Sequence, residues 1–164
     1  MMSKHFSNSH DPSEIEDDLQ VLMDGIINEE YVKLETGKDD LSSISYLTLT
    51  IDTWKQSVYD LHLFLPNLQH LALDGSIISS VRDLGIGLRF LQSLSLSGCG
   101  LIDIDGIGVL TGLKDLCLSD NTISDVTPLA MHENIQVSLI DNFFSFIHTD
   151  FLNSNLIFVD THRI

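Results

Sequence analysis

The sequence predicts an α/β fold, a solenoid of about four stacked units that form one curved parallel sheet behind an N-terminal helix. Three observations predict it. Apolar residues recur in one frame, successive copies of the frame begin 22 to 24 residues apart, and turn-forming pairs follow each short apolar run. Leucines spaced by two, such as Leu94 and Leu96, fit a strand and not one face of a helix. A leucine-rich helical bundle is therefore disfavoured.

The repeated frame predicts the position of each strand. The three complete copies are Leu68, Leu71, Leu73, Ser76 and Ile78; Leu91, Leu94, Leu96, Cys99 and Leu101; and Leu113, Leu116, Leu118, Asn121 and Ile123. A more divergent copy precedes them at Ile44, Leu47, Leu49 and Asp52. This spacing is the leucine-rich repeat pattern LxxLxLxx(N/C)xL, in which the strand leucines point inward and the Asn or Cys bonds backbone groups at the turn. One unit cannot close its own core, so stacking and terminal caps are required.

The repeats divide the chain into four regions. We expect a disordered acidic arm over 1–12, an N-terminal helix and cap over 13–43, leucine-rich repeats over 44–136 and a non-repeat tail over 137–164. Ser13 and Glu16 have the spacing of a capping box, and apolar residues at helical spacing follow them. They predict a helix from about residue 12 to residue 27.

The tail over 137–164 departs from the repeat pattern. A further repeat that began at Ile135 would place Ser138 where an inward leucine belongs and Phe143 where the asparagine belongs. Two interpretations stay open. The codons of Gln136 to Ser138 read across a splice donor and the remainder is translated intron, or the tail is a native element that caps the last repeat. Comparison of the transcript with the genomic sequence decides between them.

The acidic composition excludes several classes of partner. The 164 residues contain 24 acidic and 8 basic side chains, a formal net charge of −16. Binding to nucleic acid or to an anionic membrane needs clustered Lys and Arg, so we expect neither. We also find no apolar run long enough to span a membrane and no apolar signal segment in the first ten residues. With two cysteines, the chain is expected to be an intracellular soluble protein.

Motifs for catalysis, cofactors or metal ions are weak. Gly85 and Gly87 lack the third glycine of a nucleotide-binding loop, because position 90 is Phe. His132 has no second histidine at metal-ligand spacing. The strand serines have no suitably placed base, so surface hydroxyls are favoured over nucleophiles. We predict that the chain is not an enzyme and has no cofactor or metal.

The strand residues that alternate outward form the candidate protein-binding surface, on the concave face of the sheet. The residues predicted to bind are His70, Asp74, Ser93, Ser95, Ser97, Asp115, Cys117 and Ser119. They are mostly small, polar and slightly acidic, so a helix or loop of a partner can approach closely. The alternative is that this face is merely solvated.

Four further residues carry individual predictions. Cys99 occupies the asparagine position and should be buried, whereas Cys117 lies between two inward leucines and should point to solvent with nothing nearby to activate its thiol. Trp54 and Tyr59 follow the first unit. We expect them to pack within its cap, with aromatic anchors for a partner as the alternative.

Three segments indicate a specific family. SVRDLG at Ser80–Gly85, CGLIDIDGI at Cys99–Ile107 and NTISDVTPL at Asn121–Leu129 resemble the leucine-rich repeat-containing protein 56 family, over roughly residues 29 to 136. The resemblance implies a non-enzymatic adaptor in the cytoplasm and cilium, with partners among intraflagellar transport or axonemal dynein arm assembly components. The alternatives are a regulatory subunit of a protein phosphatase, suggested by the short-repeat subclass, and an inactive truncated isoform.

Overall fold

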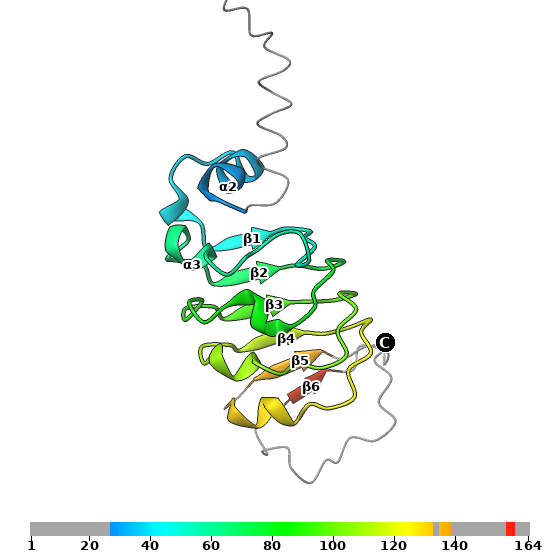
Figure 1. The fold of residues 1–164 in the computed structure, drawn as a ribbon. Helices are drawn as coiled ribbons and strands as arrows, with labels where there is room; N and C mark the ends of the chain where they lie inside the picture. Colours follow the sequence, from blue (N-terminus) through cyan, green and yellow to red (C-terminus); the bar gives the residue numbers. More distant parts are fainter. Residues whose placement is uncertain (1–26, 133–134, 139–156, 160–164) are drawn as a thin grey trace, which may run out of the picture.

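The computed structural model describes residues 27–132, 135–138 and 157–159. Figure 1 shows short strands stacked side by side in chain order, with a helix next to the first strand. In chain order the elements are α2 (Glu29–Thr36), η1 (Leu41–Ser43), β1 (Tyr46–Thr48), α3 (Leu61–Phe64), β2 (His70–Ala72), η2 (Val81–Leu84), β3 (Ser93–Ser95), η3 (Ile107–Val109), β4 (Asp115–Cys117), η4 (Thr127–Met131), β5 (Gln136–Ser138) and β6 (Ile157–Val159).

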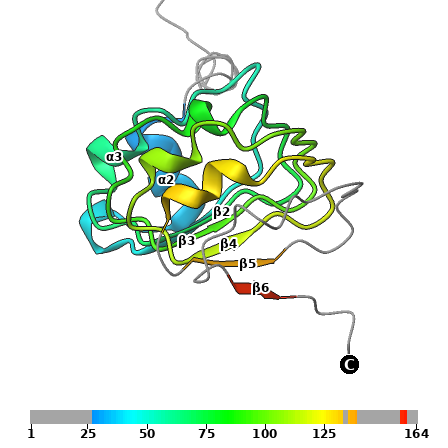
Figure 2. The same cartoon turned by 90° about the horizontal axis from the view of Figure 1, so that it is seen from below.

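The strands form one parallel sheet in the order β1-β2-β3-β4-β5-β6. The register aligns the central residues of the first five strands, which are Leu47, Leu71, Leu94, Leu116 and Val137. All five are buried, at 2% exposure or less. Figure 2, seen along the stack, shows the strands on one side of the solenoid and the segments that connect them on the other. The predicted fold class is therefore confirmed.

The remaining apolar positions of the frame fill the interior between the sheet and the returning segments. Leu73, Leu96 and Leu118 have no measurable exposure, and neither do Ile104 and Ile107 in the segment that follows β3. A repeat places two or three such side chains inside its coil and leaves both coil faces apolar. Each coil is therefore completed by its neighbours, which accounts for the single continuous core.

The asparagine position of the frame holds the turns together. Buried Asn121 accepts hydrogen bonds at Oδ1 from the N–H groups of Cys99, 3.1 Å, and Leu101, 3.0 Å, and donates from Nδ2 to the carbonyl of Leu96, 2.8 Å. Ser76 replaces it in an earlier repeat and accepts from the N–H of Ile51 at 3.0 Å. Cys99, buried as predicted, donates from Sγ to the carbonyl of Leu73. These bonds join each turn to its neighbour.

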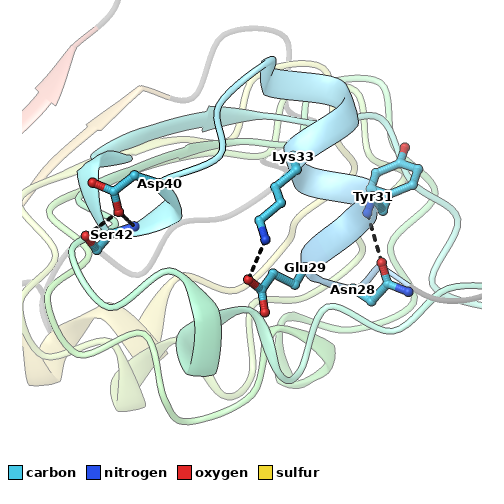
Figure 3. A network of polar contacts seen from close by, with 6 residues as sticks. All are labelled: Asn28, Glu29, Tyr31, Lys33, Asp40 and Ser42. Carbon is cyan, nitrogen blue, oxygen red and sulfur yellow. Dashed lines mark hydrogen bonds and ion pairs between the residues drawn. The ribbon is translucent and has the colours of Figure 1, made fainter.

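The N-terminal end of the core is covered by α2, whose Val32 is fully buried. Figure 3 shows the polar contacts that shape this cap. Asn28 accepts from the N–H of Tyr31 at 2.9 Å, and Lys33 pairs with Glu29 at 2.8 Å. Gly37 ends the helix in the left-handed conformation, at φ 65°. The helix predicted over residues 12 to 27 lies outside the described residues except for Ile27, which is buried.

The sheet continues past residue 136, where the sequence frame stops. Val137 pairs with Leu116 and is fully buried, so an inward position of β5 falls on Val137. A repeat frame that began at Ile135 would place this inward position one residue later. The next strand, β6, pairs with β5 in parallel. Both strands bring part of the tail into the same sheet, while residues 139–156 and 160–164 lie outside the described part.

Candidate functional site

The concave face is made by the side chains that point away from the leucine interior. Register places Tyr46, His70, Ser93 and Asp115 in one row across β1 to β4. Thr48, Ala72, Ser95 and Cys117 form the next row. No outward position of these four strands carries Lys or Arg, and the face has Asp74 and Asp115 as its charged groups. The predicted residues thus share one face, which is small, polar and negatively charged.

Hydrogen bonds connect the predicted residues at the carboxyl ends of the strands. Asp74 Oδ1 accepts from Ser95 Oγ at 2.6 Å and from the N–H of Ser97 at 2.8 Å. Ser97 Oγ lies 3.1 Å from Cys117 Sγ, which lies 3.5 Å from Ser119 Oγ. The five side chains span three repeats, so the turns fix their positions relative to one another. His70, Ser93 and Asp115 lie in the other row and are not part of this network.

Accessibility differs among the predicted residues. His70, Asp74 and Asp115 are exposed, and Ser93, Ser95, Ser97 and Cys117 are half-buried. Ser119 is only 7% exposed, so its hydroxyl serves the network rather than the accessible surface. The expectation that all strand serines are surface hydroxyls is wrong for Ser119. The sequence carries no signal of this, because Ser97 has the same spacing from its strand leucines as Ser119.

Cys117 has an environment that the sequence did not predict. Partial burial raises the pKa of its thiol, but hydrogen bonds from Ser97, from Ser119 and from Ser95 outweigh this and lower the pKa below the ordinary 9.0. Burial raises the pKa of the Cys99 thiol to about 11. The prediction that nothing near Cys117 activates its thiol is therefore wrong, because serines of two neighbouring repeats approach the sulfur.

Two aromatic side chains extend the face toward the N-terminal cap. Tyr46 is 62% exposed, and its ring lies at a tilt to that of His70 with the ring centroids 6.4 Å apart. The Tyr46 hydroxyl accepts a hydrogen bond of 3.0 Å from Thr48 Oγ1. A flat aromatic area on β1 and β2 therefore adjoins the hydroxyl network on β2 to β4. At the other end, Gln136 of β5 continues the row of Asp115.

Neither a metal-ion site nor a membrane-spanning helix is found among the described residues. Within residues 27–132, 135–138 and 157–159, no group of three or more His, Cys, Asp or Glu side chains is placed to hold a metal ion. His132 is buried, and its Nε2 lies 3.2 Å from the carbonyl oxygen of Ile107. No helix among these residues is long and apolar enough to cross a membrane.

Comparison with known proteins supports the repeat assignment. The family model for leucine-rich repeats in two copies matches residues 89–131. The mouse protein called leucine-rich repeat-containing protein 56 is 46% identical over 99 residues, and the human protein of that name has the same identity over the same length. The chain is a leucine-rich repeat protein related to leucine-rich repeat-containing protein 56.

The extent of these matches is partial. Each mammalian alignment covers 60% of this leucine-rich repeat protein and 18% of the relative, so the chain spans about a fifth of the relatives' length. A Trypanosoma brucei brucei homologue is 30% identical over 105 residues, which is 63% of this chain and 14% of that protein. The family resemblance seen in the three sequence segments is confirmed.

Solved structures support the solenoid. Internalin C2 from Listeria monocytogenes aligns with a TM-score of 0.60 and 30% identity, covering 79% of this leucine-rich repeat protein and 60% of the internalin. A second Listeria monocytogenes internalin aligns with a TM-score of 0.51 and 27% identity, covering 63% and 31% of the two chains. Leucine-rich repeats of this fold are typically non-catalytic modules for protein interaction.

Proposed function

We propose that this chain is a non-enzymatic adaptor that binds a protein partner on the concave face, in axonemal dynein arm assembly or intraflagellar transport in motile cilia. The observation that carries the binding role is the row arrangement of small polar side chains across β1 to β4. The ciliary role is inferred from the relationship to leucine-rich repeat-containing protein 56. The corresponding location is the cytoplasm and the cilium.

The partner segment is expected to be basic and regular. The row of Thr48, Ala72, Ser95 and Cys117 has short side chains, which leave space for a helix or an extended segment to lie against the strands. Asp74 and Asp115 attract cations, and none of the outward positions of β1 to β4 carries Lys or Arg to repel them. The overall charge of −16 adds long-range attraction for a basic partner. Tyr46 and His70 supply flat contact area at one end.

Affinity capture from ciliated cells, followed by mass spectrometry, tests the function. Recovery of intraflagellar transport or dynein assembly components supports the adaptor role. Recovery of a phosphatase catalytic subunit instead favours the regulatory-subunit alternative, and recovery of chaperones alone favours an inactive form. Either of the last two results contradicts the proposal.

A pair of variants tests the surface. Ser93→Arg with Asp115→Arg places two bulky cations in the outward row, and we expect partner capture to fall at least about tenfold through charge repulsion and steric exclusion. Ser124→Arg with Asp39→Arg makes the same change of charge at exposed positions outside the concave face. This control should retain capture. Equal capture by both double variants would move the interface off the strands.

A further inference from the structure

The loop after β1 presents an aromatic surface outside the concave face. Trp54 is 78% exposed, so it does not pack in the cap as the sequence predicted, whereas Tyr59 is 45% exposed and lies against the next repeat at Gly85. The loop is nevertheless well held. Asp52 Oδ1 accepts from the N–H of Trp54 at 3.0 Å, and the Asp52 carbonyl accepts from the N–H groups of Lys55 and Gln56 at 2.9 and 2.8 Å. A fixed turn therefore holds a large indole toward solvent.

Trp54 and Tyr59 line the same hollow, which has a volume of about 460 Å³. Arg82 and Asp83, at the start of η2 in the next repeat, form its other side. Tyr59 lies directly on the backbone of this second wall, because a Cβ atom at Gly85 would meet Tyr59 Cδ2 at 2.9 Å. Two repeats thus build the hollow together, and their stacking fixes its shape.

Of the charged side chains that line the hollow, the two cations have carboxylate partners, whereas the carboxylate has no cation among the described ion pairs. Lys55 pairs with Asp52 at 3.1 Å, and Arg82 pairs with Asp105. Asp83 takes part in none of the ion pairs among the described residues, and its Oδ2 accepts a backbone hydrogen bond from Ser80 at 3.2 Å. The two cations are thus neutralised locally, while one carboxylate in the lining has no cation.

We propose that this hollow is a second docking surface that accepts an arginine side chain of a partner protein segment. Guanidinium groups are planar and stack on the faces of Trp and Tyr, and they also pair with carboxylates in a fork geometry. Trp54 and Tyr59 supply the faces, and Asp83 supplies a carboxylate that has no cation among the described ion pairs. Trp and Tyr are also the side chains most enriched among the residues that dominate binding energy at interfaces. This docking surface lies outside the concave face, so the proposal does not rest on the function proposed for that face.

Tryptophan fluorescence reports on this surface directly, because Trp54 is the single tryptophan of the chain. The probe is a 12-residue synthetic peptide with two arginines beside a leucine, titrated into the full chain. Matched peptides carry citrulline, which has the shape of arginine without the charge, or glutamate at the same positions. We expect saturable quenching or a blue shift with the arginine peptide and affinity at least about tenfold weaker with the other two.

Variants assign the response to the hollow. Tyr59→Ala removes one face but keeps the reporter, and Asp83→Asn removes the charge with little change of shape, so each should weaken binding several-fold. Ile102→Ala removes an apolar side chain that is 67% exposed and does not line the hollow, and it should leave binding unchanged. Equal responses to the three peptides, or unchanged affinity in both Tyr59→Ala and Asp83→Asn, would overturn the proposal. If Tyr59→Ala does not fold, Asp83→Asn decides the result.

Discussion

Asn121 is the residue on which the turn of its repeat depends most. Its side chain is buried and makes hydrogen bonds with groups of both its own turn and the preceding repeat. Asn121→Ala leaves the N–H groups of Cys99 and Leu101 buried without this acceptor, at about 1 to 3 kcal/mol for each unsatisfied group. We expect a loss of about 3 kcal/mol in the free energy of unfolding, measured by urea denaturation.

The matched control is Asn67→Ala. Asn67 is exposed and donates one hydrogen bond, from Nδ2 to the carbonyl of Ser42 at 2.8 Å. Water can replace that bond, so we expect a loss of about 0.5 kcal/mol. Equal losses in the two variants would show that the inward amide does not hold the turn.

The two cysteines should differ in their reaction with iodoacetamide. Only the thiolate reacts, and the pKa of Cys117 lies below 9.0 while burial raises that of Cys99 to about 11. At pH 8 Cys117 should react at least about tenfold faster, and its rate should reach half its maximum below pH 9. Mass spectrometry of the alkylated protein, with Cys117→Ser as the control, measures both. A half-maximum above pH 9 would contradict the prediction.

At the scale of the elements, η2 ends at a backbone conformation that only glycine adopts easily. Gly85 has φ 74° and ψ −171°, and a Cβ atom there would lie 3.0 Å from the carbonyl oxygen of Tyr59. Gly85→Ala therefore adds steric overlap to backbone strain, and we expect a loss of at least about 3 kcal/mol. Urea denaturation measures this loss.

Gly98→Ala measures the cost of backbone strain at a positive φ without the steric overlap present at Gly85. Gly98 also has a positive φ, 64°, but a Cβ atom there would meet nothing within 4 Å. Its expected cost is about 1 kcal/mol, that of the left-handed conformation alone. A loss at Gly98 as large as the loss at Gly85 would show that contact with Tyr59 adds nothing.

The strands and their turns could be predicted because one frame recurs. Leu47, Leu71, Leu94 and Leu116 keep the same spacing from their turns, and each lies at the centre of a strand. β5 could not be placed correctly, since Val137 and Ile135 replace the leucines and the frame shifts by one residue. The pairing of β5 with β4 depends on backbone bonds, such as that from the Gln136 N–H to the Lys114 carbonyl, which leave no mark on the side-chain pattern.

The whole molecule carries a net charge of −16, so repulsion among carboxylates opposes folding. Its ion pairs between described residues lie at the surface, with Asp52 as the least exposed partner, and contribute little. Salt should therefore raise stability, and we expect the urea midpoint to increase between about 0.05 and 0.5 M NaCl. A lower midpoint at high salt would show that the ion pairs outweigh the repulsion.

The candidate site could be predicted only in part. Alternation along each strand predicts which residues share the concave face, and the register brings His70, Ser93 and Asp115 into one row. Alternation along a strand does not predict the contacts between repeats. The approach of Ser97 to Cys117 and the hollow that Arg82 lines together with Trp54 join residues about 20 to 30 positions apart, and their geometry follows from the twist and stacking of the coils.

The parallel register has a mechanical consequence. Strand-to-strand hydrogen bonds run along the stack, so a pull between its two ends loads them in tension, and the array peels open one rung at a time. A pull along the strands instead shears a whole row of bonds together and meets greater resistance. A protein segment bound across the concave face would therefore be held more firmly against a pull along the strands than against a pull along the axis of the coil.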